Sequence, residues 1–283
     1  MAGGGSSVRP DGTFVVTNVA PGDYYLTANS TSSAPPGTVT PEREFAQQAI
    51  AVSGADLSGV VVQMVKGARV TGRIVPDAGL AFDFPPSRSA AYALPAEPDV
   101  PGRGGSGDGK VQDDGSFELK GLFGPRVFRV LGAPNWRLKE VRIGGRDSTD
   151  QPVDFKGTEE LTGIQIVLTN RLNLVTGTVQ DERGVPTKDA IVIVFAENAA
   201  RWRYPSRFVA LGRPSPESGQ FRVSALPAGT YLAVAVPLSP TLDHQDAETL
   251  ERLRRHGTRV VLDEGGTQNL TLKITKEPVG GDR

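Results

Sequence analysis

The sequence predicts an all-β protein built of tandem antiparallel β-sandwiches, with one short helix in the last of them. The chain of 283 residues contains 34 glycines and 22 prolines, which places turns at close intervals and disfavours long helices. In addition, a pattern of alternating strands recurs along the chain about once per 104 residues, the size of one small domain.

The first repeated element is a β-hairpin. Asp11, Asp114 and Ser218 open DGTFVVTNVAPGDYYL, DGSFELKGLFGPRVFR and SGQFRVSALPAGTYLA, at spacings of 114 − 11 = 103 and 218 − 114 = 104 residues. In each copy a tight turn precedes a strand that starts with phenylalanine, and a Pro/Gly turn leads into a second strand. We expect one phenylalanine per copy to point into the core: Phe14, Phe117 and Phe221.

The second repeated element is a strand of period two, which reads LSGVVVQM from Leu57, LTGIQIVL from Leu161 and NLTLKI from Asn269. The first two copies are followed by a V-T-G strand, RVTGRIV and LVTGTVQ, so V-T-G opens a unit and the alternating strand ends it. The predicted division is a partial C-terminal part of a module at 1–66, complete modules at 67–169 and 170–275, and a tail at 276–283.

Residues 1–66 contain the hairpin and the closing strand but no V-T-G strand. A half sandwich buries too little apolar surface to offset its chain entropy, so we expect this part to be less stable or docked onto its neighbour. We also expect the chain to be part of a longer protein.

A short helix is predicted within TLDHQDAETLERLRRHG, between the last hairpin and the last strand. Thr241 or Asp243 is the expected N-cap, and Leu250 and Leu253 are expected to face inward.

Charge and composition exclude several classes of function. The formal net charge is −1, which provides no bulk attraction to nucleic acid, and the chain has no cysteine for disulfides or thiol chemistry. No run of about 18 apolar residues is present to span a membrane. The start, MAGGGSSVRPDG, lacks the apolar part of a signal peptide.

Catalytic, metal and phosphate sites find little support. His244 and His256 lie twelve residues apart, which turns them about 120° from each other on a helix. The glycine-rich stretch 102–110 has Val111 where a phosphate-binding loop needs Ser or Thr. Acidic turns at Asp108, Asp113, Asp114, Asp147 and Asp150 suit hairpin chemistry better than calcium. We expect no enzyme activity, no metal and no cofactor.

The one candidate ligand site is RWRYPSRF, residues 201–208. It combines Trp202, Tyr204 and Phe208 with Arg201 and Arg203. Such a set can bind a polysaccharide or a protein, or its aromatic rings can simply cover the sandwich. Trp136, in contrast, is expected in or near a core.

The sequence VTGTVQDERGVP from Val175 to Pro186, together with SGQFRV and LPAGTY from Leu226 to Tyr231, resembles the carboxypeptidase regulatory-like domain. The stretch WRLKEVRIGGRDSTDQPVDF from Trp136 is similar to tandem bacterial versions of that domain. The resemblance implies an Ig-like or transthyretin-like sandwich without peptidase activity. It implies structural spacer or protein-interaction modules of a larger bacterial protein that is secreted, periplasmic or at the cell surface. Neighbouring domains of that chain are the expected partners. A carbohydrate-binding module of starch-binding-like fold is the alternative.

Overall fold

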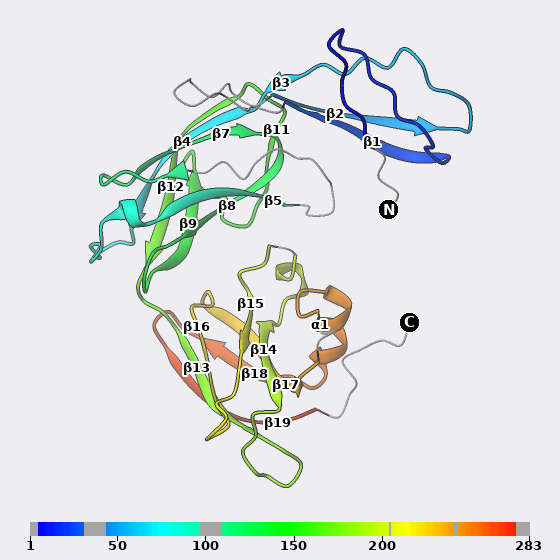
Figure 1. Ribbon diagram of the computed structural model, residues 1–283. Coiled ribbons are helices and arrows are strands. Elements are labelled where there is room, and N and C mark those ends of the chain that lie inside the picture. The colour runs from blue at the N-terminus through cyan, green and yellow to red at the C-terminus, as the bar shows by residue number, and fades with distance from the viewer. Residues whose placement is uncertain (1–4, 31–43, 97–108, 204, 240–242, 276–283) are drawn as a thin grey trace.

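The computed structural model describes residues 5–30, 44–96, 109–203, 205–239 and 243–275. The strands form a central sandwich, a C-terminal sandwich and an N-terminal hairpin that extends from the central one (Figure 1). Within the described ranges the one α-helix is α1 (Ala247–Arg254), in the C-terminal sandwich. The all-β fold with a short helix in the last module is thereby confirmed.

The central sandwich stacks a five-stranded sheet on a four-stranded sheet. In order, the first sheet contains β10 (Arg146–Asp147), β9 (Arg137–Ile143), β12 (Glu160–Thr169), β4 (Ala68–Pro76) and β7 (Ser116–Leu122). The second sheet contains β11 (Val153–Phe155), β8 (Gly124–Leu131), β5 (Ala90–Pro95) and β6 (Gly109–Lys110). A short 3₁₀ turn, η1 (Pro86–Arg88), precedes β5.

The C-terminal sandwich stacks a three-stranded sheet on a four-stranded sheet. The first contains β16 (Gln220–Ser224), β13 (Leu174–Gln180) and β19 (Thr267–Lys273), in that order. The second contains β15 (Val209–Gly212), β14 (Ala190–Ala196), β17 (Gly229–Pro237) and β18 (Thr258–Leu262). The 3₁₀ turn η2 (Ala199–Arg201) follows β14, and α1 connects β17 to β18.

The V-T-G strand lies in the middle of one sheet in both sandwiches. It pairs antiparallel with the phenylalanine strand on one side, β4 with β7 and β13 with β16. On its other side it pairs parallel with the last strand, β4 with β12 and β13 with β19. We expected wholly antiparallel sheets, but one sheet of each sandwich contains a parallel pair. Parallel pairing is possible because the chain passes through the second sheet between the two strands, which gives a long crossover.

The repeated β-hairpin predicted from the sequence is wrong as a pairing. The phenylalanine strand and the strand after it lie in different sheets, β7 and β8 in the central sandwich and β16 and β17 in the C-terminal one. The turn between them carries the chain from one sheet to the other, because the phenylalanine strand pairs with the V-T-G strand instead.

The glycine of V-T-G is required by the close approach of its neighbours. A Cβ on Gly177 would lie 1.9 Å from the carbonyl oxygen of Leu270 and 2.8 Å from Cε1 of Phe221. Gly72 is similarly enclosed by Ile164 and Phe117. Each phenylalanine ring thus packs over the backbone of the opening strand.

Each sandwich has its own cluster of buried apolar side chains, one drawn from residues 68–168 and one from residues 175–272. Phe117 and Phe221 are buried in them, as predicted. Trp136 is also buried, and its indole nitrogen donates a 2.7 Å hydrogen bond to Oδ1 of Asp83, which confirms its expected place in the core.

Helix α1 begins at a different residue from the one predicted. Its N-cap is Asp246, whose carboxylate accepts hydrogen bonds of 2.8 Å from the backbone nitrogen and hydroxyl of Thr249. Asp243 instead accepts a bond from the backbone nitrogen of Gln245, and Thr241 lies outside the described residues. Leu250 and Leu253 face inward as predicted and are buried.

The N-terminal part forms a three-stranded sheet of β1 (Gly22–Asn29), β2 (Glu44–Val52) and β3 (Val65–Lys66). Two predicted strands, after Phe14 and over 57–64, are absent from this described part, and Phe14 is only half-buried. In the sandwiches the equivalent segments pair with a V-T-G strand, and residues 5–66 contain none. Within the described residues of this part, the two predicted strands therefore have no neighbouring strand to pair with.

We predict that Gly177→Ala destabilises the C-terminal sandwich by about 3 kcal/mol, because the clashing atoms belong to the backbone of β19 and cannot move aside. Chemical denaturation followed by tryptophan fluorescence measures this loss. Thr178→Ala, on the same strand but half-exposed, is the control and should cost less than about 1 kcal/mol. Equal stability of Gly177→Ala and the wild type would contradict the proposed close approach.

Candidate functional site: the joint between the two sandwiches

The segment between β14 and β15 carries the predicted ligand-binding residues. Its Trp202 is 4% exposed, its indole nitrogen donates a 2.7 Å hydrogen bond to the carbonyl oxygen of Ala196, and its ring meets Phe195 edge-on at 5.6 Å. The ring therefore closes the core of the C-terminal sandwich and offers no face to a ligand.

Phe208 is buried as well, and two guanidinium groups stack on its ring. The distances from Cζ to the ring centroid are 4.6 Å for Arg201 and 5.0 Å for Arg207. Arg203 is exposed to solvent, and Tyr204 lies outside the described residues. The structure thus brings Arg201 and Phe208 together but leaves the rings of Trp202 and Phe208 covered.

Arg207 leaves this segment and reaches the central sandwich. Its Nε donates to both carboxylate oxygens of Asp150, at 3.1 and 3.0 Å. Its Nη1 lies 3.3 Å from the carbonyl oxygens of Leu138 and Lys139 on β9. One arginine of the C-terminal sandwich is thereby fixed by three residues of the central sandwich.

Arg129, on β8, completes the contact from the other side. Its Nη2 donates to Oδ1 of Asp150 at 3.1 Å and to the carbonyl oxygen of Pro205 at 3.0 Å, and its Nη1 donates to Thr149 at 2.8 Å. Burial lowers the pKa of Arg129 and the charge of Asp150 opposes this, and an arginine stays charged in either case. Asp150 therefore holds two guanidinium groups that would otherwise repel each other.

A second ionic cluster joins the sandwiches near the linker. Nζ of Lys139 lies 2.6 Å from Oδ2 of Asp77 and 2.9 Å from Oε1 of Glu264, which belongs to the β18–β19 turn. Arg171, in the linker itself, places Nη1 3.2 Å from Oδ2 of Asp77. Four charged groups thus connect the central sandwich, the linker and the C-terminal sandwich.

The pKa values of this cluster are shifted in the directions that favour the ion pairs. Burial alone would raise the pKa of Asp77, but the hydrogen bond from Lys139, the backbone nitrogen of Ala78 and the charge of Arg171 hold it below its ordinary value. The pKa of Lys139 is raised, mainly by its hydrogen bond with Asp77. The cluster is therefore charged at neutral pH.

The sequence did not reveal this joint. In the sequence Asp150 is recognisable only as part of an acidic turn, and its partner Arg207 lies 57 residues away. Lys139 and Glu264 are 125 residues apart. No spacing rule connects side chains of two separate modules, so only the fold brings them together.

The histidines and acidic turns considered in the sequence form no metal or catalytic site within the described ranges. No three His, Cys, Asp or Glu side chains come together there to hold a metal. Asp114 and Asp147 accept hydrogen bonds within their own turns, and Asp113 accepts one from Ser87. Residues 102–108, including Asp108, lie outside the described part, and none of the helices in that part is long and apolar enough to cross a membrane.

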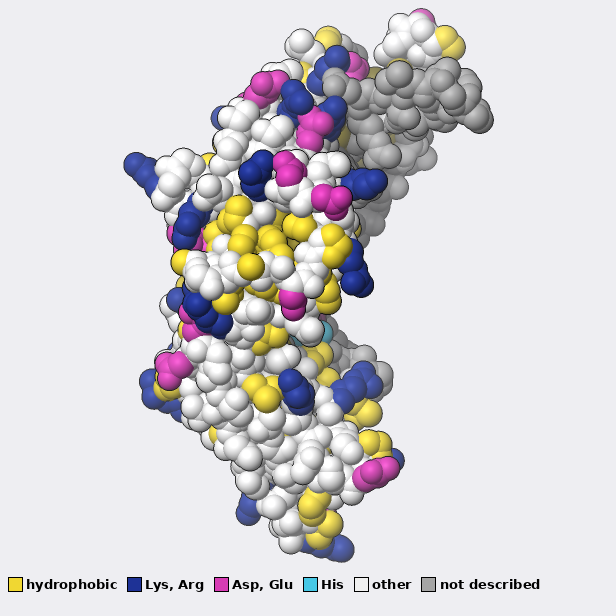
Figure 2. Space-filling view, turned by 90° about the vertical axis from the view of Figure 1, so that its left-hand side faces the viewer, with side chains coloured by type: hydrophobic (Ala, Val, Ile, Leu, Met, Phe, Trp, Pro, Cys, Tyr) yellow, Lys and Arg dark blue, Asp and Glu magenta, His cyan; other side chains and the backbone are white. Residues whose placement is uncertain are grey.

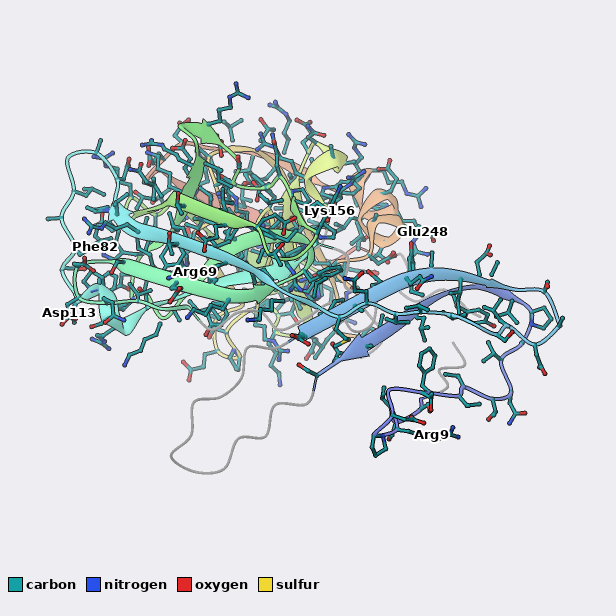
Figure 3. The ribbon with its side chains drawn as sticks, turned by 90° about the horizontal axis from the view of Figure 1, so that it is seen from above. Arg9, Arg69, Phe82, Asp113, Lys156 and Glu248 are labelled. Carbon is teal, nitrogen blue, oxygen red and sulfur yellow. The ribbon has the colours of Figure 1, made fainter. Side chains whose placement is uncertain are left out.

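The outer face of β4, β7 and β12 carries a shallow depression with several basic side chains. Arg69 pairs with Glu118, and Arg73 pairs with Asp114 at 2.9 Å (Arg69 is labelled in Figure 3). Two of the cations of the depression therefore already have carboxylate partners, which weakens its attraction for an anion.

Hydrophobic side chains gather in the upper half of the view in Figure 2, bordered by charged residues. Phe82 lies on this side of the molecule (Figure 3) and is half-buried, with its ring 5.3 Å from Phe84 and 4.9 Å from Trp136. Phe82 therefore extends the core of the central sandwich toward the surface.

No protein-family profile and no curated protein sequence matches this chain. Among solved structures it is similar to the Bacillus anthracis TIE protein, with 12% identity and a TM-score of 0.25 over 93% of this chain and 44% of that one. It is also similar to GBS52, a minor pilin of Streptococcus agalactiae, with 11% identity and a TM-score of 0.29 over 76% of this chain and 100% of that one. A third similar structure is a streptococcal ancillary pilin, with 16% identity and a TM-score of 0.28 over 93% of this chain and 78% of that one. The chain spans less than half of the TIE protein. The β-sandwich that the resemblance to carboxypeptidase regulatory-like domains implies is present in the fold itself, and membership of that family is not shown.

We predict that Arg207→Ala loosens the joint while leaving both cores folded, because it removes the contacts with Asp150 and β9 but little core surface. Hydrogen bonds to a charged group contribute about 1.5–3 kcal/mol, so unfolding of the two sandwiches should separate into two transitions in calorimetry. Spin labels on β5 and β14 should show a broader distance distribution. Arg203→Ala is the matched control, and identical behaviour of both variants would refute the role of Arg207.

We predict that acid weakens the joint through Asp77. Its folded-state pKa is lowered, so its stabilisation is fully present above the unfolded value of about 3.9 and is lost as the pH falls through the folded value. Asp77→Asn should cost about 1.5–3 kcal/mol at pH 7 and flatten the stability profile below about pH 4. Glu264→Gln, which leaves the Asp77–Lys139 pair intact, should retain the acid step. A parallel pH profile for wild type and Asp77→Asn would rule out this assignment.

Proposed function

We propose that the chain is a non-catalytic pair of structural sandwich modules, preceded by a partial module, that holds neighbouring parts of a larger bacterial protein at a fixed spacing. The observation that carries this proposal is the joint: Asp150 is shared by Arg129 and Arg207 from opposite sandwiches. A flexible tether would not need buried or half-buried ion pairs between its modules.

The linker supports the same function. Only residues 170–173 separate β12 from β13, and this is too short to act as a flexible spacer. Asn173 is buried and its side-chain nitrogen donates to the carbonyl oxygen of Leu226. Both ends of the linker are thus anchored, by Arg171 to Asp77 and by Asn173 to the C-terminal sandwich.

We further propose that the modules divide near residues 66 and 170 and act outside the cytoplasm, in a secreted, periplasmic or surface-attached protein. The separate apolar cores of residues 68–168 and 175–272 favour this division. The absence of cysteine is compatible with folding in an oxidising compartment.

The alternative of a carbohydrate-binding module receives less support. Stacking on a sugar requires an exposed aromatic face, and the rings of Trp202 and Phe208 are 4% and 6% exposed. The basic residues Arg201 and Arg207 are engaged with Phe208 and Asp150.

We predict that the wild-type chain is not retained on starch, chitin or cellulose, and that Trp202→Ala destabilises the C-terminal sandwich by about 3–5 kcal/mol because it empties a core position. Polysaccharide pull-down and denaturant unfolding provide the two measurements. Arg203→Ala, on the exposed side of the same segment, is the control for both. Retention of the wild type that Trp202→Ala abolishes without loss of stability would favour the carbohydrate-binding function.

A further inference from the structure

One residue of β9 has no partner on the neighbouring strand. Val167 of β12 lies opposite Glu140, and the next residue of β12, Leu168, lies opposite Leu138. Lys139 is therefore an extra residue in β9, and it forms a β-bulge at the end of the strand nearest the linker. A bulge of this kind changes the direction in which its side chain and its backbone carbonyl groups point.

The bulge decides which way Lys139 points. Val141 and Ile143, two residues apart, pack in or against the core of the central sandwich. In a regular strand the next inward position would be Lys139. Because of the bulge, Leu138 packs against the core instead, and Nζ of Lys139 lies 2.6 Å from Oδ2 of Asp77. The lysine is thus turned out of the core and toward the joint.

The bulge also turns two carbonyl groups in the same direction. In a regular strand, the carbonyl oxygens of consecutive residues point to opposite edges. Here the carbonyl oxygens of Leu138 and Lys139 both lie 3.3 Å from Nη1 of Arg207. The central sandwich thereby offers two acceptors to one guanidinium group of the C-terminal sandwich.

Arg207 continues a row of contacts along the edge of β9. The carbonyl oxygen of Val141 accepts a 2.8 Å hydrogen bond from the backbone nitrogen of Ser148, and its nitrogen donates to the hydroxyl of Thr149 at 2.9 Å. The next acceptors along this edge are the two carbonyl groups of the bulge. Asp150, the residue after Thr149, holds the guanidinium group that reaches them.

The core of the central sandwich does not need the extra residue. Without Lys139 the strand would read RLEVRI, in which the three inward residues alternate regularly. Leu138 and Glu140 would then be consecutive, and they already face consecutive residues of β12, so no other residue has to shift. While Lys139 is present, regular pairing would instead bury its ammonium group in the core, which is costly. The lysine therefore also keeps the bulge in place.

We propose, on the basis of the fixed spacing proposed above, that Lys139 is an inserted residue that positions the C-terminal sandwich on the central one. It acts through the register of β9 with β12. The bulge directs the lysine side chain to Asp77 and Glu264 and directs two carbonyl oxygens to Arg207. The length of one strand thereby sets the orientation of the two modules.

The test measures the distance between the sandwiches in a full-length chain that lacks Lys139. The chain contains no cysteine, so spin labels can be attached to cysteines introduced at Lys120 and Arg222, two exposed positions on β7 and β16. We expect a narrow distance distribution in the wild type, and a broader distribution with a shifted mean without Lys139. The melting temperature of the central sandwich should fall by less than about 4 °C, because its core residues keep their partners.

Two control variants separate the bulge from the charge and from deletion as such. Lys139→Gln keeps the bulge and both carbonyl groups but removes the ion pairs, so the mean distance should stay at the wild-type value. Removal of Thr162 shortens β12 at its own bulge against β4, at the end of the strand away from the linker. It should leave the distance distribution unchanged.

A second measurement tests the contact with Arg207. Arg207→Ala should broaden the distance distribution of the Lys139→Gln variant, because the bulge still holds the guanidinium group there. In the chain that lacks Lys139, Arg207→Ala should add less, because the two carbonyl acceptors no longer converge.

A wild-type distance distribution in the folded chain that lacks Lys139 would overturn this role. Unfolding of the central sandwich on deletion of Lys139 would overturn it as well, because the extra residue would then serve the core. A broad distribution in the wild type itself would contradict the fixed spacing, and this result distinguishes failure of the proposed function from failure of the role of Lys139.

Discussion

The close approach of three strands around one glycine is the constraint on which each sandwich depends. With a backbone oxygen 1.9 Å from a Cβ position at Gly177, only glycine allows the last strand and the phenylalanine strand to flank the opening strand together. The phenylalanine ring then covers the backbone and begins the core between the sheets. The rest of the module, including its crossover through the second sheet, is arranged around this contact.

The joint between the sandwiches depends on a different balance. Two guanidinium groups at close range repel each other, and the Asp150 carboxylate between them turns that repulsion into attraction. Because each arginine also donates to backbone carbonyl oxygens of the opposite sandwich, the contact fixes direction as well as distance. The cluster of Asp77, Lys139, Glu264 and Arg171 acts at the linker, so the two modules are held at two separate places.

The sequence predicts what is local and periodic. The phenylalanine strands and the last strands of both sandwiches, the short helix and the burial of Trp136 follow from turn residues and alternation. The expected pairing of each phenylalanine strand with the strand after it was wrong, because the turn between them leads into the opposite sheet. The strands predicted after Phe14 and over 57–64 are not formed. Alternation shows which residues of a strand would face the core, but it does not show whether a second strand is present to pair with its edge. The joint was missed because its charges come from distant modules. The aromatic residues Trp202 and Phe208 were recognised, but whether they face the core or the solvent depends on the path of the chain after η2.

The parallel pairing of first and last strands has a mechanical consequence. Tension along the chain enters the central sandwich at the start of β4 and leaves it at the end of β12. Since the two strands run parallel, these points lie at opposite ends of the pair. Pulling therefore slides one strand along the other, and the hydrogen bonds between them bear the load together instead of opening one after another. The same geometry holds for β13 and β19.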